Sequence, residues 1–354
     1  MKIVQIAPLW ENIPPPLYGG TERIVSSITE GLVTKGHDVT LFAVGTSHTN
    51  AKLVSVYPRP LFRDHIAWTN IMYPLLNITE AFDREKEFDI IHMHLNKSSD
   101  YLALSLAVPI KHKVVFTLHF PYPVAQNRDD RHAVFQKYKD LNYISISNSQ
   151  RRGGENMNWI ATVYNGIDLT PFTLNHSPQN YLLWLGKFNP DKGTREAIQA
   201  AQKAGMTIKI AGAIDKLEGA NFEYWEKEVK PLIDNHRVIF VGEVDDVKKN
   251  KLYGNAYAFL NPIQWNEPFG LVMVEAMATG TPVISFKNGA APELIKNNET
   301  GYLVDTVDEM VEAIGKIDAI DRKTCRLHVE KHFTEAIMTN NYEDVYQKIL
   351  DNMI

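Results

Sequence analysis

Short β-branched runs alternate with longer amphipathic stretches along this sequence, and this alternation limits the folds that the chain can adopt. In the first half, strands are expected at residues 2–7, 39–43, 90–92, 114–118 and 143–147, and helices at 21–35 and 129–141. Gly36 is placed to end the first helix. Strands that alternate with helices are typical of a parallel sheet covered by helices. The pattern therefore predicts an α/β fold.

A second series of the same kind follows a segment at 169–179, which contains two prolines and no apolar periodicity. Strands are expected at 181–185, 207–211, 238–241, 258–260 and 282–286, and helices at 194–204, 271–279 and 335–350. With 354 residues, the chain exceeds the usual size of a single core. We therefore expect two Rossmann-like, doubly wound domains, at 1–170 and 171–334. We expect the C-terminal helix at 335–354 to pack back on the first domain.

Charge and cysteine content narrow the class of protein. The net charge is −5, and an acidic chain without a long basic stripe argues against nucleic acid as the main partner. Cys325 is the only cysteine, which fits a reducing compartment, so we expect a cytoplasmic protein. No apolar run approaches the roughly 20 residues of a membrane span. Any membrane contact is expected to be at most peripheral.

Polar and glycine residues follow the predicted strands where each strand ends. They are Gly19, Gly20, His119, Gly186, Lys187, Lys192, Gly212, Gly242 and Glu267. In open parallel sheets, ligands bind outside the carboxyl ends of the strands. Two sheets that faced each other by these edges would form an interdomain cleft, which is a favoured place for small-molecule sites.

The most informative segment is EPFGLVMVE at 267–275, in which Glu267 and Glu275 are eight residues apart. Pro268 suits the first turn of a helix, and Gly270 lets a ligand approach the backbone. The amides expected to point at an anion are those of Phe269, Gly270 and Leu271. Glu275 would then lie about 7 Å further along the helix, about the reach from a diphosphate to a ribose.

This segment and several others resemble the retaining glycosyltransferases of family four, which have the two-domain GT-B fold and a hallmark of two glutamates separated by seven residues. The other matching segments are YGGTERIV near the start, FTLH at 116–119, YNGID at 164–168, the glycine-lysine loop at 186–193, VGEVDD at 241–246 and TGYLV near the end. The resemblance covers nearly the whole chain. The opening resembles most closely a subset that includes the avilamycin-pathway glycosyltransferase.

The resemblance implies that a hexosyl group moves from a UDP- or GDP-sugar to an acceptor hydroxyl, with retention and without a metal or other cofactor. Glu267 would bind hydroxyls of the transferred sugar, and Glu275 the ribose hydroxyls. The alternative is that both are solvated acidic residues at the start of a surface helix. Lys187 and Lys192 would neutralise the diphosphate. Family members generally carry Arg at the first of these positions, so Lys187 lacks the bidentate grip of a guanidinium.

Four further positions acquire roles, three of them from the resemblance. Gly19 and Gly20 would let the first helix approach the β-phosphate of the donor; a tight turn after three prolines is the plain alternative. His119 would lie beside the transferred sugar, where it joins Glu267 and Lys192 as a catalytic candidate. A hydrogen-bonded structural histidine is the alternative. Gly212 is assigned to the donor site by its strand-end position.

The segment VGEVDDVKK offers a loop that could read the base, with Val244 and Asp246 as its contacts. One carboxylate could accept both the N1 proton and the amino group of guanine, whereas uracil shows only one such proton. Helix capping by Asp245 or Asp246 explains the same residues equally well.

His92 and His94 alternate at strand period and therefore share one face. One rival class is a metal-dependent hydrolase that uses Asp89, His92, His94 and His119. The simpler interpretation is that His92 and His94 belong to a strand that enters the interdomain cleft. The other rivals are a nucleotide-sugar 2-epimerase of the same fold and a non-catalytic nucleotide-sugar sensor.

Overall fold

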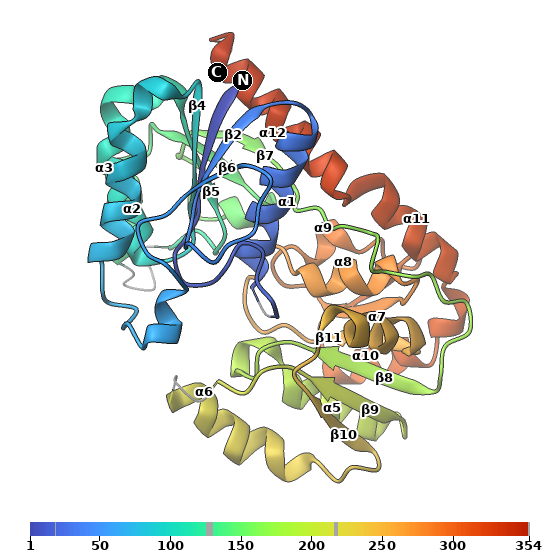
Figure 1. Ribbon diagram of the computed structural model, residues 1–354. Helices are drawn as coiled ribbons and strands as arrows, with labels where there is room; N and C mark the ends of the chain where they lie inside the picture. Colours follow the sequence, from blue (N-terminus) through green and yellow to red (C-terminus); the bar gives the residue numbers. More distant parts are fainter. Residues whose placement is uncertain (18, 125–129, 216–218, 353–354) are drawn as a thin grey trace. The chain divides into compact units, whose positions relative to one another are not determined.

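The computed structural model describes residues 1–17, 19–124, 130–215 and 219–352, and it divides into two compact units (Figure 1). Unit 1 consists of Met1–Gly166 and Glu335–Ile354, and unit 2 consists of Ile167–Thr334. The C-terminal helix α12 (Glu335–Leu350) thus belongs to unit 1, although unit 2 precedes it in the chain.

The described part of unit 1 contains a seven-stranded parallel sheet in the order β3-β2-β1-β4-β5-β6-β7. Its strands are β1 (Lys2–Ile6), β2 (Asp38–Phe42), β3 (Lys52–Val54), β4 (Ile90–Leu95), β5 (Val114–Leu118), β6 (Asn142–Ser145) and β7 (Trp159–Thr162). The inner strands β4 and β5 are buried along their whole length because helices cover both faces of the sheet.

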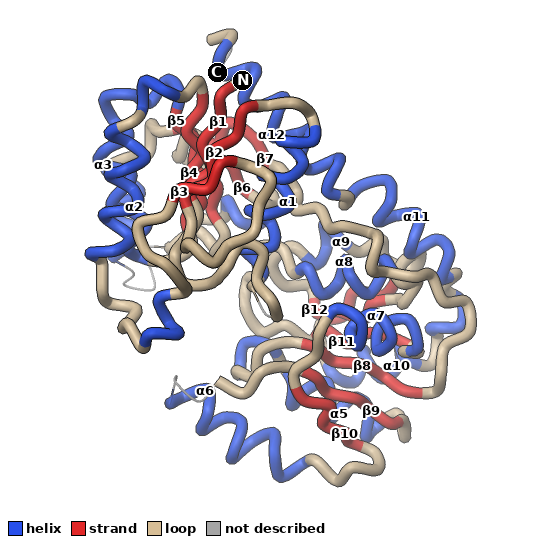
Figure 2. The backbone as a smooth tube through the Cα atoms, viewed as in Figure 1, coloured by secondary structure: helices blue, strands red, loops and turns tan. Residues whose placement is uncertain are grey.

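The helices of unit 1 form a layer on each face of this sheet, as Figure 2 shows. They are α1 (Gly20–Thr34), α2 (Met72–Asp83), α3 (Leu102–Ala107), α4 (Asp130–Lys137) and α12. Helix α1 buries Ile24, Val25, Ile28 and Leu32, which recur at helical spacing. Helices α1 and α12 pack against each other, and α2 packs against α3.

Unit 2 contains a six-stranded parallel sheet, within its described residues, in the order β10-β9-β8-β11-β12-β13. Its strands are β8 (Tyr181–Leu185), β9 (Thr207–Ala211), β10 (Val238–Gly242), β11 (Ala258–Asn261), β12 (Val283–Phe286) and β13 (Gly301–Val304). Its helices are α5 (Thr194–Lys203), α6 (Gly219–Tyr224), α7 (Asp246–Asn255), α8 (Leu271–Ala278), α9 (Ala291–Leu294), α10 (Val307–Ile314) and α11 (Arg322–His332). This strand order is that of the doubly wound nucleotide-binding fold.

The prediction of two Rossmann-like sheets is confirmed, and most predicted strands lie within two residues of the observed ones. The edge strands β3, β7 and β13 were not predicted. They are three or four residues long and have few fully buried positions, so they show no continuous apolar run. Among the described residues, no helix is long and apolar enough to cross a membrane.

The contact between α1 and α12 depends on a helical glycine. A methyl group added at Gly31 would lie 2.3 Å from Oγ1 and 2.9 Å from Cγ2 of Thr339, which is itself buried. Both distances are shorter than van der Waals contact, so only glycine lets the two helices approach this closely.

We expect Gly31→Ala to lower the melting temperature, although alanine favours helix by about 1 kcal/mol, because overpacking costs roughly 1–3 kcal/mol. Adding Thr339→Ala should recover most of the loss. Gly254→Ala in α7 is the matched control, since its new methyl would meet its nearest neighbour at 3.5 Å. Thermal denaturation of the three variants measures the effect, and equal shifts for Gly31→Ala and Gly254→Ala would contradict it.

Candidate functional site

In unit 2, the predicted site residues gather at the topological switch point of the sheet, where β8 and β11 are neighbours. Lys192 lies in the loop after β8, and Glu267 lies in the loop after β11. The Lys192 ammonium forms an ion pair with Oε2 of Glu267, and both side chains are largely buried. Trp265 donates from Nε1 to the same carboxylate oxygen at 2.9 Å, and its ring centroid lies 5.0 Å from the Lys192 nitrogen.

The loop that carries Lys192 is held in place by its own backbone. It forms a short 3₁₀ turn, Pro190–Lys192, in which the Asn189 side chain accepts a hydrogen bond from the Lys192 amide at 3.1 Å. Nearer to β8, Lys187 pairs with Asp215 at 2.6 Å. Both predicted phosphate lysines therefore have a carboxylate partner in this structure.

Gly212 follows β9, and the close packing of the backbone at this position requires a glycine. Its φ is +153°, and a Cβ atom there would lie 1.8 Å from the carbonyl oxygen of Gly186. The Gly212 amide donates to the Gly242 carbonyl at 3.0 Å. Three glycines thus bring the ends of β8, β9 and β10 together, with backbone rather than side chains at their surface.

Helix α8 begins at Leu271, and Gly270 is its N-cap residue with a φ of 95°. The prediction that Pro268 lies in the first helical turn was therefore wrong, because the left-handed conformation of Gly270 delays the helix. Of the three predicted amides, only that of Leu271 is in the helix; those of Phe269 and Gly270 precede it. The first turn of a helix carries the positive end of its dipole, and in α8 the Met273 amide of this turn donates to the Gly270 carbonyl at 3.0 Å.

Glu275 is buried, and both of its carboxylate oxygens have partners from α7. Lys249 donates from Nζ to Oε1 at 2.7 Å, and Tyr253 donates from its hydroxyl to Oε2 at 3.1 Å. The alternative of a solvated surface glutamate is therefore wrong for Glu275, which is only 7% exposed. Sequence reasoning missed Lys249 and Tyr253, although their spacing of four residues placed them on one helix face.

At the start of α7, the capping alternative is confirmed for Asp245, whose side chain accepts a hydrogen bond from the Lys248 amide at 2.8 Å. Asp246 is the first residue of the helix and lies 3.2 Å from the Lys249 ammonium. Lys249 therefore joins Asp246 to Glu275. Val244 precedes the helix in the same loop and is partly exposed.

In unit 1, α1 begins at Gly20 with Gly19 as its N-cap residue, one residue earlier than the predicted start at Thr21. Glu22, in the first turn, is buried and folds back towards Gly19. Burial raises the pKa of Glu22 to about 7, so this carboxyl titrates near neutral pH. Sequence reasoning did not single out Glu22; its position three residues after Gly19 was the available signal.

His119 follows β5, and its Nε2 forms a hydrogen bond with Nδ1 of His94 at 3.0 Å. His92 uses both ring nitrogens, on Tyr346 and Thr117, and His94 uses both, on His119 and Gln5. Burial lowers the pKa of His92 and of His94, and it lowers the pKa of His119 to about 3, so these rings are neutral at physiological pH.

The arrangement of a metal-dependent hydrolase is not formed. Asp89 accepts a hydrogen bond from the Lys2 amide and lies before the first residue of β4, whereas His94 lies near the other end of that strand. Nowhere in the described ranges do three His, Cys, Asp or Glu side chains gather closely enough to hold a metal ion.

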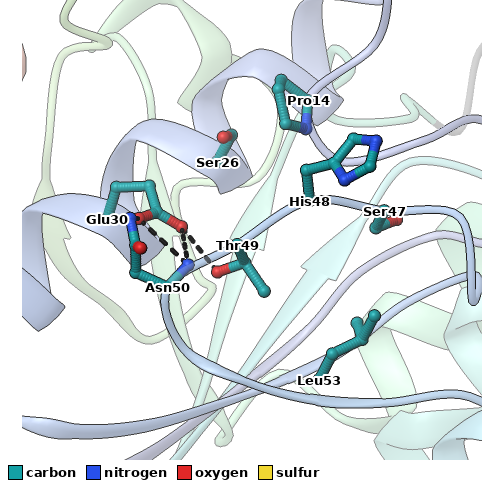
Figure 3. A pocket seen from close by; sticks show the side chains of 8 residues that line it. All are labelled: Pro14, Ser26, Glu30, Ser47, His48, Thr49, Asn50 and Leu53. Carbon is teal, nitrogen blue, oxygen red and sulfur yellow. Dashed lines mark hydrogen bonds between the residues drawn. The ribbon is translucent and has the colours of Figure 1, made fainter.

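A separate open pocket of about 510 Å³ lies in unit 1, between α1 and the loop after β2 (Figure 3). It is lined by Pro14, Ser26, Glu30, Ser47, His48, Thr49, Asn50 and Leu53. The Glu30 carboxylate accepts hydrogen bonds from the Thr49 hydroxyl at 2.5 Å and from Nδ2 of Asn50 at 2.7 Å. Glu30 thus fixes this loop against α1, and none of the predicted site residues lines the pocket.

Two parallel sheets of nucleotide-binding order, with a helix start at Gly20 in unit 1 and the Lys192–Glu267 pair at the switch point in unit 2, are the features of a two-domain GT-B enzyme. Comparison with known families agrees: the family described as Glycosyltransferase Family 4 matches residues 18–170, and Glycosyl transferases group 1 matches residues 168–326. Together the matches run through both units. The chain belongs to the glycosyltransferases of family four, and it is a glycosyltransferase by that membership.

Individual relatives cover the chain almost completely. An uncharacterized glycosyltransferase of Methanocaldococcus jannaschii is 26% identical over 98% of this chain and 94% of its own length. A glycosyltransferase involved in avilamycin A biosynthesis has a similar structure, with a TM-score of 0.71 and 19% identity over 99% of each chain. Anabaena HepE in complex with UDP-glucose has a TM-score of 0.75 and 17% identity, over 98% of this chain and 100% of its own.

We expect Lys249→Met to destabilise unit 2 by about 3 kcal/mol, because it leaves the buried Glu275 carboxylate without its cation. Lys248→Met is the matched control, since Lys248 is the exposed neighbour on the same helix. Chemical denaturation followed by tryptophan fluorescence, to which Trp184, Trp225 and Trp265 of unit 2 contribute, measures the difference. Equal midpoints for the two variants would contradict the structural role of Lys249.

Proposed function

We propose that this enzyme transfers a hexosyl group from a UDP- or GDP-sugar to an acceptor hydroxyl, with retention of configuration and without a metal ion or other cofactor. The observation that carries the proposal is the Lys192–Glu267 pair at the switch point of the unit 2 sheet. It sets a cation suited to phosphate beside a carboxylate suited to sugar hydroxyls.

The charges of unit 2 suit the chemistry of the leaving group. Breaking the anomeric bond places negative charge on a nucleotide diphosphate and leaves an oxocarbenium-like sugar. Lys192, Lys187 and the amino end of α8 would stabilise that negative charge by preorganised electrostatics. In this proposal, the diphosphate competes with Glu267 and Asp215 for the two ammonium groups.

Glu275 would bind the ribose hydroxyls with the lone pairs that Lys249 and Tyr253 leave available. A carboxylate oxygen accepts more than one hydrogen bond, so two protein partners do not exhaust it. The partners hold the carboxylate in one orientation, which lowers the entropy lost when the ribose binds.

In unit 1, the amino end of α1 at Gly20 would stabilise the β-phosphate, and His119 would contact the transferred sugar. The family resemblance implies front-face attack, in which a donor phosphate oxygen takes the proton of the acceptor hydroxyl. No protein nucleophile is therefore assigned. HepE, crystallised with UDP-glucose, supports a UDP-sugar as the first donor to test. GDP-sugars are tested as well, because the Asp246 carboxylate could accept hydrogen bonds from guanine.

Mass spectrometry of UDP- and GDP-hexoses incubated with the enzyme and pooled acceptors tests the proposal, because transfer adds one hexose to an acceptor. We expect Lys192→Ala to lower kcat about a hundredfold or more, as loss of one group that stabilises the developing charge does. Lys203→Ala, an exposed lysine on α5, is the control and should keep parental activity. Unchanged kinetics in Lys192→Ala would refute the phosphate role.

We expect transfer to continue in excess EDTA, because lysines and helix dipoles supply the positive charge. The measurement is the initial rate with and without chelator, at the donor concentration that gives half-maximal rate. Loss of activity in EDTA that is restored by a divalent ion would contradict the metal-free mechanism and leave the transfer reaction itself standing.

A further inference from the structure

A chain of seven side chains links the C-terminal helix α12 to His119 through the interior of unit 1. Its members, in order of contact, are His119, His94, Gln5, Tyr346, His92, Thr117 and Tyr342. Every link is a hydrogen bond of 2.6–3.2 Å. All members except His119 are buried, so water does not compete for these bonds.

The orientation of the Gln5 amide gives this chain a direction. Nε2 of Gln5 donates to the Tyr346 hydroxyl at 3.2 Å, and its Oε1 is 2.8 Å from Nε2 of His94. In this orientation of the amide, its oxygen accepts, so Nε2 of His94 carries the proton of this hydrogen bond. Neutral His94 then has an unprotonated Nδ1, which must accept from Nε2 of His119.

The other half of the chain follows the same direction. The Tyr346 oxygen accepts from Gln5, so its own proton is available for Nδ1 of His92 at 2.6 Å. Nε2 of His92 then donates to the Thr117 hydroxyl at 2.8 Å, and Thr117 lies 3.2 Å from the Tyr342 hydroxyl. From His119 to Thr117, each donor therefore points to the next member in the order of contact.

We propose that this chain fixes His119 as the Nε2-protonated tautomer, so that its Nδ1 accepts a hydrogen bond from a substrate hydroxyl. Gln5, His94 and Tyr346 are then positioning residues of the enzyme. The proposal rests on the assignment of His119 to the sugar site in the proposed function. A neutral histidine of the opposite tautomer would instead present a donor, which matches a different set of substrate atoms.

Tyr346 is the member on which the direction depends. Without its hydroxyl, one end of the Gln5 amide lacks a partner in either orientation, so the two orientations become similar in energy. The His119 proton should then distribute between both ring nitrogens. In the parent enzyme, reversal requires the amide and every other link to change together.

Long-range ¹H–¹⁵N correlation spectra of the substrate-free, full-length enzyme report the tautomer of His119 directly. The resonance is assigned by its disappearance in His119→Gln. We expect the Nε2-protonated form in the parent and a mixture in Tyr346→Phe, with kcat/KM lowered about twofold to tenfold, as for one misdirected hydrogen bond. Tyr143→Phe is the matched control: Tyr143 is a buried tyrosine of unit 1 whose hydroxyl donates to the Tyr138 carbonyl, outside the chain.

Gln5→Met, which removes the amide, should reproduce the mixed tautomer if Tyr346→Phe does not fold. An Nδ1-protonated His119 in the parent, or identical behaviour of Tyr346→Phe and Tyr143→Phe, would overturn the proposal. A mixed tautomer with unchanged kcat/KM would overturn the substrate contact of His119. Failure of the parent to transfer sugar would refute the proposed function, and the tautomer measurement is independent of that result.

Discussion

The direction of the strands is the constraint on which the rest of this structure depends. Because every strand in each sheet is parallel to its neighbours, the loops that follow the strands all leave from one edge. At the switch point of a doubly wound sheet, the neighbouring connections diverge to opposite faces and leave a space for ligands. Lys192 and Glu267 meet at such a point in unit 2, although 75 residues separate them.

The two units prepare their site residues by different physical means. In unit 2, Lys192, Lys187 and Lys249 are each paired with a carboxylate, so the site is electrostatically balanced. In the proposed function, a diphosphate would replace the carboxylates as partner of Lys187 and Lys192, which are partly exposed. The Lys249–Glu275 pair is buried, and removal of one partner costs more than the pair contributes. The Lys249–Glu275 pair is therefore suited to hold the Glu275 carboxylate in one orientation.

In unit 1, by contrast, the histidines of the proposed sugar site are neutral. Burial keeps the three histidines uncharged, and hydrogen bonds satisfy both nitrogens of His92 and His94. In a network of neutral groups, the histidine tautomers and the amide orientation decide which atom of each hydrogen bond donates, so the network has a direction. A charged network does not have this property. The close approach of α12 to α1 at Gly31 holds two of its members, Tyr342 and Tyr346, in place.

The two α/β series, the boundaries of most strands and the glycines and charged residues that follow them could be predicted from the amino-acid sequence alone. These properties depend on periodicity and on neighbours along the chain, so they can be inferred from one segment at a time. The partners of the polar side chains became known only from the folded protein: Lys249 and Tyr253 bind Glu275, Asp215 pairs with Lys187, and Gln5 and Tyr346 contact the histidines. These contacts join residues from separate elements, up to 341 positions apart in the chain. No local sequence pattern predicts which buried polar groups come into contact in the folded protein.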